Sequence, residues 1–171
     1  SNDSAAPVQN AATGSCLVAR DFDTLFMAIN GTTRPASLDY STSANKYLQN
    51  VHFNVDSLTF AEPQSLANNT ITAFANFAKQ NSAKTFTIHL SGSVGTTRAS
   101  DLDFANQRAA RVKALLIEKG VKSSQIVIDA PYSAGVYDDG GNASQRQSAR
   151  NVKLTIHPTC STNTGSSGSE R

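Results

Sequence analysis

The hydrophobic and polar positions change their period in a regular order along the centre of the chain. Residues 51–55 alternate between apolar and polar side chains, as a half-buried strand does. From Pro63 onward, the apolar residues follow helical spacing instead. Residues 84–90 alternate again, with Phe86, Ile88 and Leu90 on one face. The pattern therefore predicts a strand, an amphipathic helix and a second strand, in that order.

A second helix and two further strands are predicted after these elements. Ser100 followed by Asp103 is typical of a capping box, and an apolar stripe then runs to Gly120, which predicts the helix end. Residues 126–128 and 152–156 predict strands, separated by a glycine-rich loop. The sum is a β-α-β-α-β-loop-β core. This is an α+β fold (an α/β sandwich) with helices on one face of a mixed sheet.

The segments outside this core have a weaker pattern. Residues 16–50 predict an N-terminal extension packed on the core, with residues 17–19 and 25–29 as a hairpin or edge strands. Residues 43–49 permit a short helix after Pro35. The flanking ranges are small and polar, which predicts a flexible linker at residues 1–15 and a flexible tail at residues 159–171. The folded domain itself is expected to span residues 51–158.

Composition excludes several classes of protein. A chain of 171 residues with 39% apolar content suits one domain with an adequate core. A net charge of +2 without a long Lys/Arg block excludes a nucleic-acid partner. No stretch approaches the roughly 20 apolar residues that span a bilayer, and no signal-peptide pattern is present. Any membrane anchor is therefore expected upstream of Ser1.

The two cysteines lie far apart in the sequence, and the three histidines are scattered singly. Redox motifs and zinc sites need clustered ligands, so we expect no metal and no cofactor. Two interpretations remain for Cys16 and Cys160. A disulfide between them would contribute on the order of 4 to 5 kcal/mol in the chain-entropy model and imply an oxidising compartment. The alternative is two unpaired thiols near the chain ends.

Three segments together resemble the OmpA/MotB-like family of peptidoglycan-binding domains. Phe53-Asn-Val-Asp-Ser57 is similar to the family's opening Phe-x-Phe-Asp-Ser strand. Residues 145–154 are similar to its closing Gln-Arg-x-x-Asn-Arg-Arg-Val-Glu-Ile segment. The family's Asn-x-x-Leu-Ser-x-x-Arg-Ala helix is matched by Asp101, Phe104, Ala105, Arg108 and Ala109. The resemblance covers residues 51–158 and implies non-covalent binding of peptidoglycan.

In that family, an aspartate after the second strand and the helix arginine grip the diaminopimelate of the stem peptide. Arg108 matches the arginine, but the family's interval places Ser93 where the aspartate stands. A serine offers only a neutral hydrogen bond, so weakened or pH-dependent binding is expected. Asp101 or Asp103 is a candidate for the missing charge, and backbone amides from Gly92 onward can receive a carboxylate. The predicted binding residues are Arg108, Ser93, Asp101, Gly92 and Phe104.

Each of these residues also has a plainer interpretation. Arg108 can be a helix-surface residue that pairs with Asp101 or Gln107. Arg150 is interpreted as structural, at the entrance to the last strand. His89 shares a strand face with two serines, which suggests hydrolysis, but no acid is evident to orient the imidazole. A surface histidine is therefore favoured, and no catalytic residue is predicted.

Two functions follow from the resemblance. The first is a wall-binding module that anchors an inner-membrane stator-like or secretion-accessory complex, for which we expect Arg108→Ala to weaken binding and leave the fold intact. The second is an interaction or dimerisation module that has lost its ligand. The resemblance extends to MotB-like accessories of type I secretion systems. It implies a periplasmic homodimer, tethered to the inner membrane by a segment absent from this chain and joined to a membrane channel partner.

Overall fold

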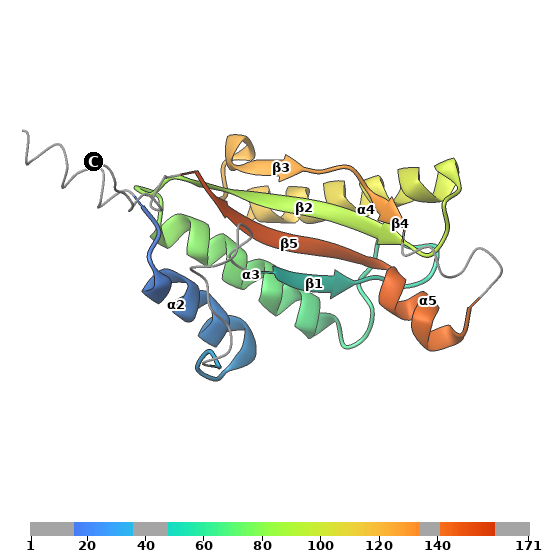
Figure 1. The fold of residues 1–171 in the computed structure, drawn as a ribbon, viewed down its shortest axis with the longest axis horizontal. Coiled ribbons are helices and arrows are strands. Elements are labelled where there is room, and N and C mark those ends of the chain that lie inside the picture. The colour runs from blue at the N-terminus through green and yellow to red at the C-terminus, as the bar shows by residue number, and fades with distance from the viewer. Residues whose placement is uncertain (1–15, 36–47, 134–140, 160–171) are drawn as a thin grey trace, which may run out of the picture.

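The computed structural model describes residues 16–35, 48–133 and 141–159 (Figure 1). The helices and strands alternate along most of this part of the chain. In order they are α2 (Ala19–Asn30), β1 (Leu48–His52), α3 (Gln64–Gln80), β2 (Phe86–Val94), α4 (Ala99–Glu118), a short 3-10 helix (Ser123–Gln125), β3 (Ile126–Ile128), β4 (Tyr132–Ser133), α5 (Ala143–Ala149) and β5 (Asn151–Pro158).

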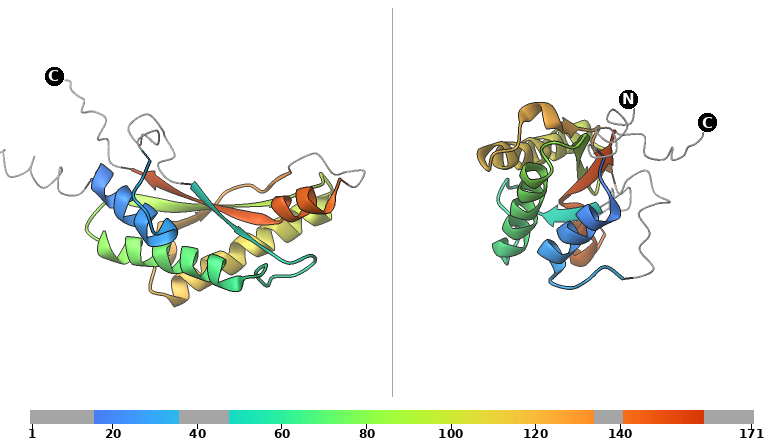
Figure 2. Two further views of the ribbon diagram at one scale, coloured as in Figure 1. Left: turned by 90° about the horizontal axis from the view of Figure 1, so that it is seen from below. Right: turned by 90° about the vertical axis from the view of Figure 1, so that its left-hand side faces the viewer.

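The strands form one mixed sheet in the order β1-β5-β2-β3, with β4 also pairing with β2. β5 is antiparallel to both of its neighbours, β1 and β2, whereas β3 and β4 run parallel to β2. Helices α2, α3 and α4 lie on the same side of this sheet (Figure 2). The predicted α+β fold with helices on one face of a mixed sheet is confirmed.

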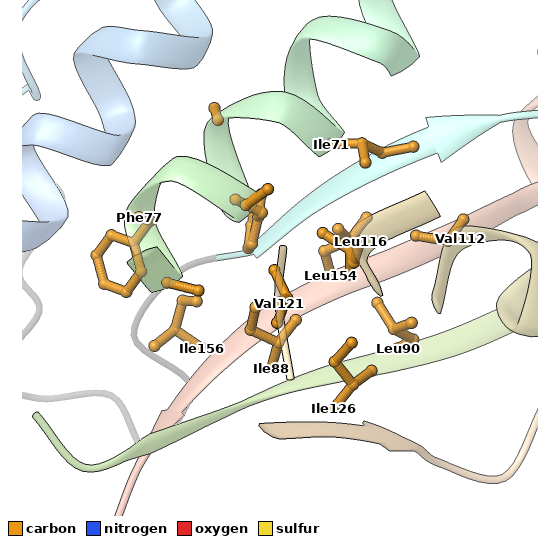
Figure 3. Close-up of a cluster of buried hydrophobic side chains, with 14 of the residues drawn as sticks. Ile71, Phe77, Ile88, Leu90, Val112, Leu116, Val121, Ile126, Leu154 and Ile156 are labelled. Atoms are coloured by element: carbon orange, nitrogen blue, oxygen red, sulfur yellow. The ribbon is translucent and has the colours of Figure 1, made fainter. Parts of the chain in front are cut away.

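The core lies between the two central strands and the helices (Figure 3). The alternation predicted for residues 84–90 is confirmed, since Phe86, Ile88 and Leu90 are buried. Full burial of a large aliphatic side chain contributes about 1.5–3 kcal/mol. The aliphatic side chains that reach 0% exposure are Ile71, Ile88, Leu90, Val112, Leu116, Val152, Leu154 and Ile156. Together they fix α3 and α4 against β2 and β5.

Helix α4 lies unusually close to β2, and Gly92 is the reason. A Cβ at Gly92 would lie 2.1 Å from the backbone oxygen of Ala105, so no side chain fits there. The helix ends as predicted: Gly120 has φ 106°, and the amides of Gly120 and Val121 donate to the carbonyls of Ile117 and Leu116. Because α4 packs directly against β2 at Gly92, Arg108 lies near the end of that strand.

The start of α4 differs from the predicted capping box. Arg98 is the residue before the first turn, and no side chain caps the helix there. Asp103 instead accepts a hydrogen bond from Gln107 at 3.2 Å, one turn along. The sequence pattern was therefore correct about the helix but wrong about how it begins.

The N-terminal extension forms a helix, so the predicted hairpin or edge strands are wrong. Phe22 and Leu25 in α2 are buried at helical spacing. From the sequence, the apolar residues of this segment were instead interpreted as two short strand-like runs. The Asp21 carboxylate accepts from the amide of Val18 at 2.8 Å, which stabilises the first turn. Gly31, at φ 72°, donates to Met27 and ends the helix. Phe22 and Leu25 of α2 belong to the hydrophobic core cluster.

Two further corrections concern the first strand and the loop before the last strand. The first strand spans Leu48–His52 rather than 51–55, and the chain leaves the sheet at the isolated bridge between Phe53 and Phe60. Helix α5 lies within the predicted glycine-rich loop. Its start is a capping box, because Asn142 accepts from the Gln145 amide while the Gln145 side chain accepts from the Asn142 amide.

Several predictions fall outside the described residues. These are the linker at residues 1–15, residues 160–171 of the tail, residues 43–47 of the permitted helix, and Cys160. Cys16 is buried at the start of the described chain, and its pairing with Cys160 stays a prediction. Within the three described ranges, no helix is both long and apolar enough to cross a membrane.

The sheet face opposite the helices carries a histidine pair. The rings of His89 and His157 stack with centroids 3.6 Å apart. Asp129 contacts His89 Nδ1 at 3.0 Å, so the sequence reasoning missed an acid that orients this imidazole. The acid follows β3, whose pairing with β2 brings residues distant in sequence together. His89 Nε2 lies 3.0 Å from the Thr87 hydroxyl.

Burial lowers the pKa of His157, and the neighbouring His89 lowers it further, while Asp129 opposes both effects. The folded state therefore favours the neutral ring, and stability is lost as the pH falls below the unfolded-state pKa of about 6.5. We predict that the free energy of unfolding falls less between neutral pH and about pH 5 in His157→Gln than in the parent. Denaturant unfolding at both pH values measures this, and equal losses would contradict it.

Candidate functional site

Arg108 is the centre of the candidate site, and it is buried. Only 2% of its surface is exposed, although it is charged. Its Nε donates to the carbonyl of Ser57 at 3.2 Å, and its Nη2 donates to the carbonyl of Asn54 at 2.9 Å. Its guanidinium also lies 4.7 Å from the ring centroid of Phe104 and 5.3 Å from that of Phe53. Arg108 therefore fixes the loop between β1 and α3 against α4.

The interpretation of Arg108 as a surface residue pairing with Asp101 or Gln107 is wrong. Asp101 instead accepts from the Thr96 hydroxyl at 2.5 Å and from Arg98 at 3.5 Å. Gln107 donates to Asp103, on the exposed side of the helix. Arg108 points the other way, into the space between α4 and the loop.

A cavity of about 310 Å³ opens beside Arg108. Its walls come from the loop after β1, the end of β2, the first turns of α4, and α5 with the residue that follows it. These elements gather at the right-hand end of the molecule in Figure 1. The lining residues are Val55, Asp56, Val94, Gly95, Thr96, Arg98, Asp101, Phe104, Arg108, Arg146 and Arg150. Segments far apart in the sequence therefore build one site.

The charges that line the cavity are mainly positive. Four arginines face two aspartates, which gives a net charge of +2 at the site. Two nitrogens have no partner among the described residues: Nη1 of Arg108, and Nε of Arg150, which is buried. Buried donors without a partner are costly, and a carboxylate oxygen is a strong acceptor for a guanidinium. The cavity is therefore suited to an anionic group.

Burial lowers the pKa of Arg108 to about 10, and the charge of Arg150 adds to this shift, whereas Asp56 opposes it. A pKa of about 10 still leaves the guanidinium charged at neutral pH. The positive charge is thus held in a confined place, where its attraction for an anion is less screened than on an open surface.

The structure divides the predicted binding residues into two groups. Asp101, Phe104 and Arg108 line the cavity together. Gly92 and Ser93 lie behind it in β2, fully enclosed by α4, α5 and β5. The Ser93 hydroxyl donates to the carbonyl of Ala149 at 2.6 Å, so it joins β2 to the end of α5. A ligand contact by Gly92 or Ser93 stays a prediction that this placement does not favour.

Four charged lining residues were missed by sequence reasoning. Arg98 is exposed at the start of α4, Arg146 is exposed in the last turn of α5, and Asp56 lies in a loop, so no periodicity marks them. Arg150 was interpreted as structural, and it does bond to Gln147 at 2.8 Å, but it also lines the cavity. The available signal was the pair of arginines at 146 and 150, within the closing segment of the resemblance.

A larger cavity of about 640 Å³ runs beside β1 and α3. Amide and aliphatic side chains dominate its lining, with Glu62 and His52 as the titratable groups. Burial lowers the pKa of His52. The concentration of fixed charge makes the Arg108 cavity the stronger candidate. In the described part of the chain, no cluster of histidine, cysteine and acidic residues is arranged to hold a metal.

Arg108→Ala is predicted to lower the free energy of unfolding by about 2 kcal/mol or more, because it leaves the carbonyls of Asn54 and Ser57 without their donor. The sequence-based expectation of an intact fold therefore changes. Arg111→Ala removes an exposed arginine from the same helix, and should change stability by less than about 0.5 kcal/mol. Urea unfolding compares the two variants, and equal, small effects would contradict the structural role of Arg108.

The fold is shared with solved periplasmic domains. The periplasmic domain of Helicobacter pylori MotB aligns with a TM-score of 0.50 and 18% identity, over 72% of this chain and 85% of that one. Another crystal structure of a MotB periplasmic domain gives 0.51 and 17%, over 77% and 81%. The peptidoglycan-associated lipoprotein from Burkholderia pseudomallei gives 0.49 and 20%, over 63% and 89%. The sequence matches no protein-family model and no curated protein. The chain therefore has the fold of the MotB periplasmic domain.

Proposed function

We propose that this chain is a periplasmic module that binds peptidoglycan non-covalently, with the Arg108 cavity receiving a carboxylate of the stem peptide. The observation that carries the proposal is the buried guanidinium of Arg108. It is held in place by two backbone carbonyls, and no described residue accepts from its Nη1, which lies beside a cavity rich in arginine. A guanidinium fixed in this way needs little reordering when it binds a carboxylate.

The size and polarity of the cavity fit one end of an amino-acid side chain. Its volume of about 310 Å³ is at the low end for small-molecule sites. Diaminopimelate presents carboxylates and an ammonium group, and Val55, Val94 and Phe104 supply apolar surface for its carbon chain. The stem peptide is therefore a better fit than a folded protein segment, and the proposed role is binding rather than catalysis.

The location and partners of the module are also proposals. The similar MotB structures are of periplasmic domains, and an oxidising periplasm is compatible with the predicted disulfide between Cys16 and Cys160. By the same resemblance, the module would form a homodimer and anchor a stator-like or secretion-accessory complex of the inner membrane to the wall. A segment outside this chain would supply the tether to the membrane and to its channel partner.

The second candidate is an interaction or dimerisation module that has kept the fold and lost the ligand. Ser93 favours it, because the family's aspartate is absent and the serine hydroxyl is already used to hold Ala149. The cluster of positive charge around the cavity favours the first candidate, since it suits an anionic ligand and an interaction module does not require it.

Arg150→Gln is predicted to weaken co-sedimentation of the protein with isolated peptidoglycan sacculi by about tenfold, because it removes one charged donor from the cavity. Arg111→Gln is the matched control, since it removes the same charge from an exposed site on α4 outside the cavity. The control should pellet like the parent at neutral and at mildly acidic pH. Equal pelleting of both variants and the parent would exclude the cavity as the binding site.

A further inference from the structure

We infer that Asp56 is the residue that binds the ligand's ammonium group, in place of the aspartate that this chain lacks at Ser93. The inference rests on the proposed function, because it assigns a contact to the ligand proposed there. The sequence predicts an arginine site without its acidic partner. With Asp56, the site has an acidic residue again, supplied by the loop after β1 instead of by β2.

Ser93 is enclosed and its hydroxyl is occupied. Its side chain is 0% exposed and donates to the carbonyl of Ala149, while Asn151 lies 3.4 Å from the same oxygen. It does not line the cavity. An ammonium group at this point would have to displace α5, so the negative charge must come from elsewhere.

The two aspartates of α4 are less suited than sequence reasoning expects. Asp101 lines the cavity, but its carboxylate already accepts from Thr96 and lies 3.5 Å from the guanidinium of Arg98. Asp103 is exposed, accepts from Gln107 and does not line the cavity. One carboxylate is therefore neutralised locally, and the other points away.

Asp56 is exposed, as Asp103 is, but its surroundings differ from those of both α4 aspartates. It lines the same cavity as Arg108, and within the described part of the chain its carboxylate makes no hydrogen bond and no ion pair. Its charge raises the pKa of Arg108, so it acts on the guanidinium electrostatically without being bound by it. Asp56 thus supplies an unpaired negative charge beside four arginines, where an ammonium group is otherwise repelled.

The loop that carries Asp56 is held on both sides. Arg108 donates to the carbonyls of Asn54 and Ser57, the residues that bracket Val55 and Asp56. Asn54 donates in turn to Thr59 at 2.9 Å and to the carbonyl of Phe60 at 3.0 Å. A carboxylate on a fixed loop loses little conformational freedom on binding. The Arg108 guanidinium therefore has two roles: it offers a positive charge to the ligand, and it holds in place the loop that carries Asp56.

The arrangement has two arms of opposite charge. Arg108 and Arg150 line the cavity as positive charges that attract a carboxylate, and Asp56 lines it as a negative charge that attracts an ammonium group. A ligand with both groups at one end, such as the amino-acid end of diaminopimelate, satisfies both arms. A ligand with its amine blocked satisfies only one.

The test combines Asp56→Asn with chemical change of the ligand. Asparagine is suitable because Asp56 has φ 48°, a left-handed conformation that asparagine also tolerates. Sacculi are used as isolated and after N-acetylation of their free amines. We expect acetylation to weaken binding of the parent by about tenfold, and Asp56→Asn to bind native sacculi about tenfold more weakly and to show little further loss on acetylation. Asp103→Asn, which removes an exposed carboxylate outside the cavity, should behave like the parent.

The outcomes separate this inference from the proposed function. If Asp56→Asn pellets with native sacculi like the parent while Arg150→Gln does not, the ammonium contact is wrong and wall binding stands. If acetylation weakens Asp56→Asn by the same factor as the parent, Asp56 does not contact the amine, and the inference is again overturned. If the parent does not pellet with native sacculi at all, both the proposed function and this inference fail.

Discussion

The buried guanidinium of Arg108 is the interaction on which the rest of the site depends. Removing a charged group from water is costly unless the protein provides hydrogen bonds or compensating charge. Here two backbone carbonyls, two aromatic rings and the nearby charge of Asp56 provide that compensation. The groups that compensate Arg108 are the same groups that shape the cavity. The stability of the loop and the geometry of the site therefore have one physical cause.

The end of β2 explains how α4 and α5 come together around that guanidinium. Gly92 leaves room for the backbone of α4, and Ser93 fixes the last carbonyl of α5. Both residues are buried between β2 and the helices, and their predicted contact with a ligand stays a prediction. The Ser93 hydroxyl, at the position where the resemblance expects an aspartate, donates inward to Ala149. The proposed function assigns recognition to the arginines of the cavity and to the carboxylate of Asp56.

The sequence was sufficient for the core because periodicity reports burial directly. The alternation around Ile88 and the helical stripe ending at Leu116 both correspond to side chains with no exposed surface. Helix α5 was missed because its seven residues include only two apolar ones, both alanines, so it has no apolar stripe. Helix α2 does carry an apolar stripe, but its apolar residues were interpreted as two separate short runs. The site was predictable only in part. Asp101, Phe104 and Arg108 could be predicted together because they share one helix. Asp56 and Arg150 reach the same cavity only through the β1–β5–β2 pairing, which local patterns do not contain.

The most direct measurement is an NMR titration of the protein with a soluble stem peptide that carries diaminopimelate. It would follow the arginine Nε–H signals together with the backbone amides of residues 54–57. Binding in the cavity should shift the Nε–H signals of Arg108 and Arg150 and the amides of the Asp56 loop, and leave that of Arg111 unchanged. Shifts confined to other surfaces, or no shifts with a peptide that competes for sacculi, would contradict the assignment of this cavity as the peptidoglycan site.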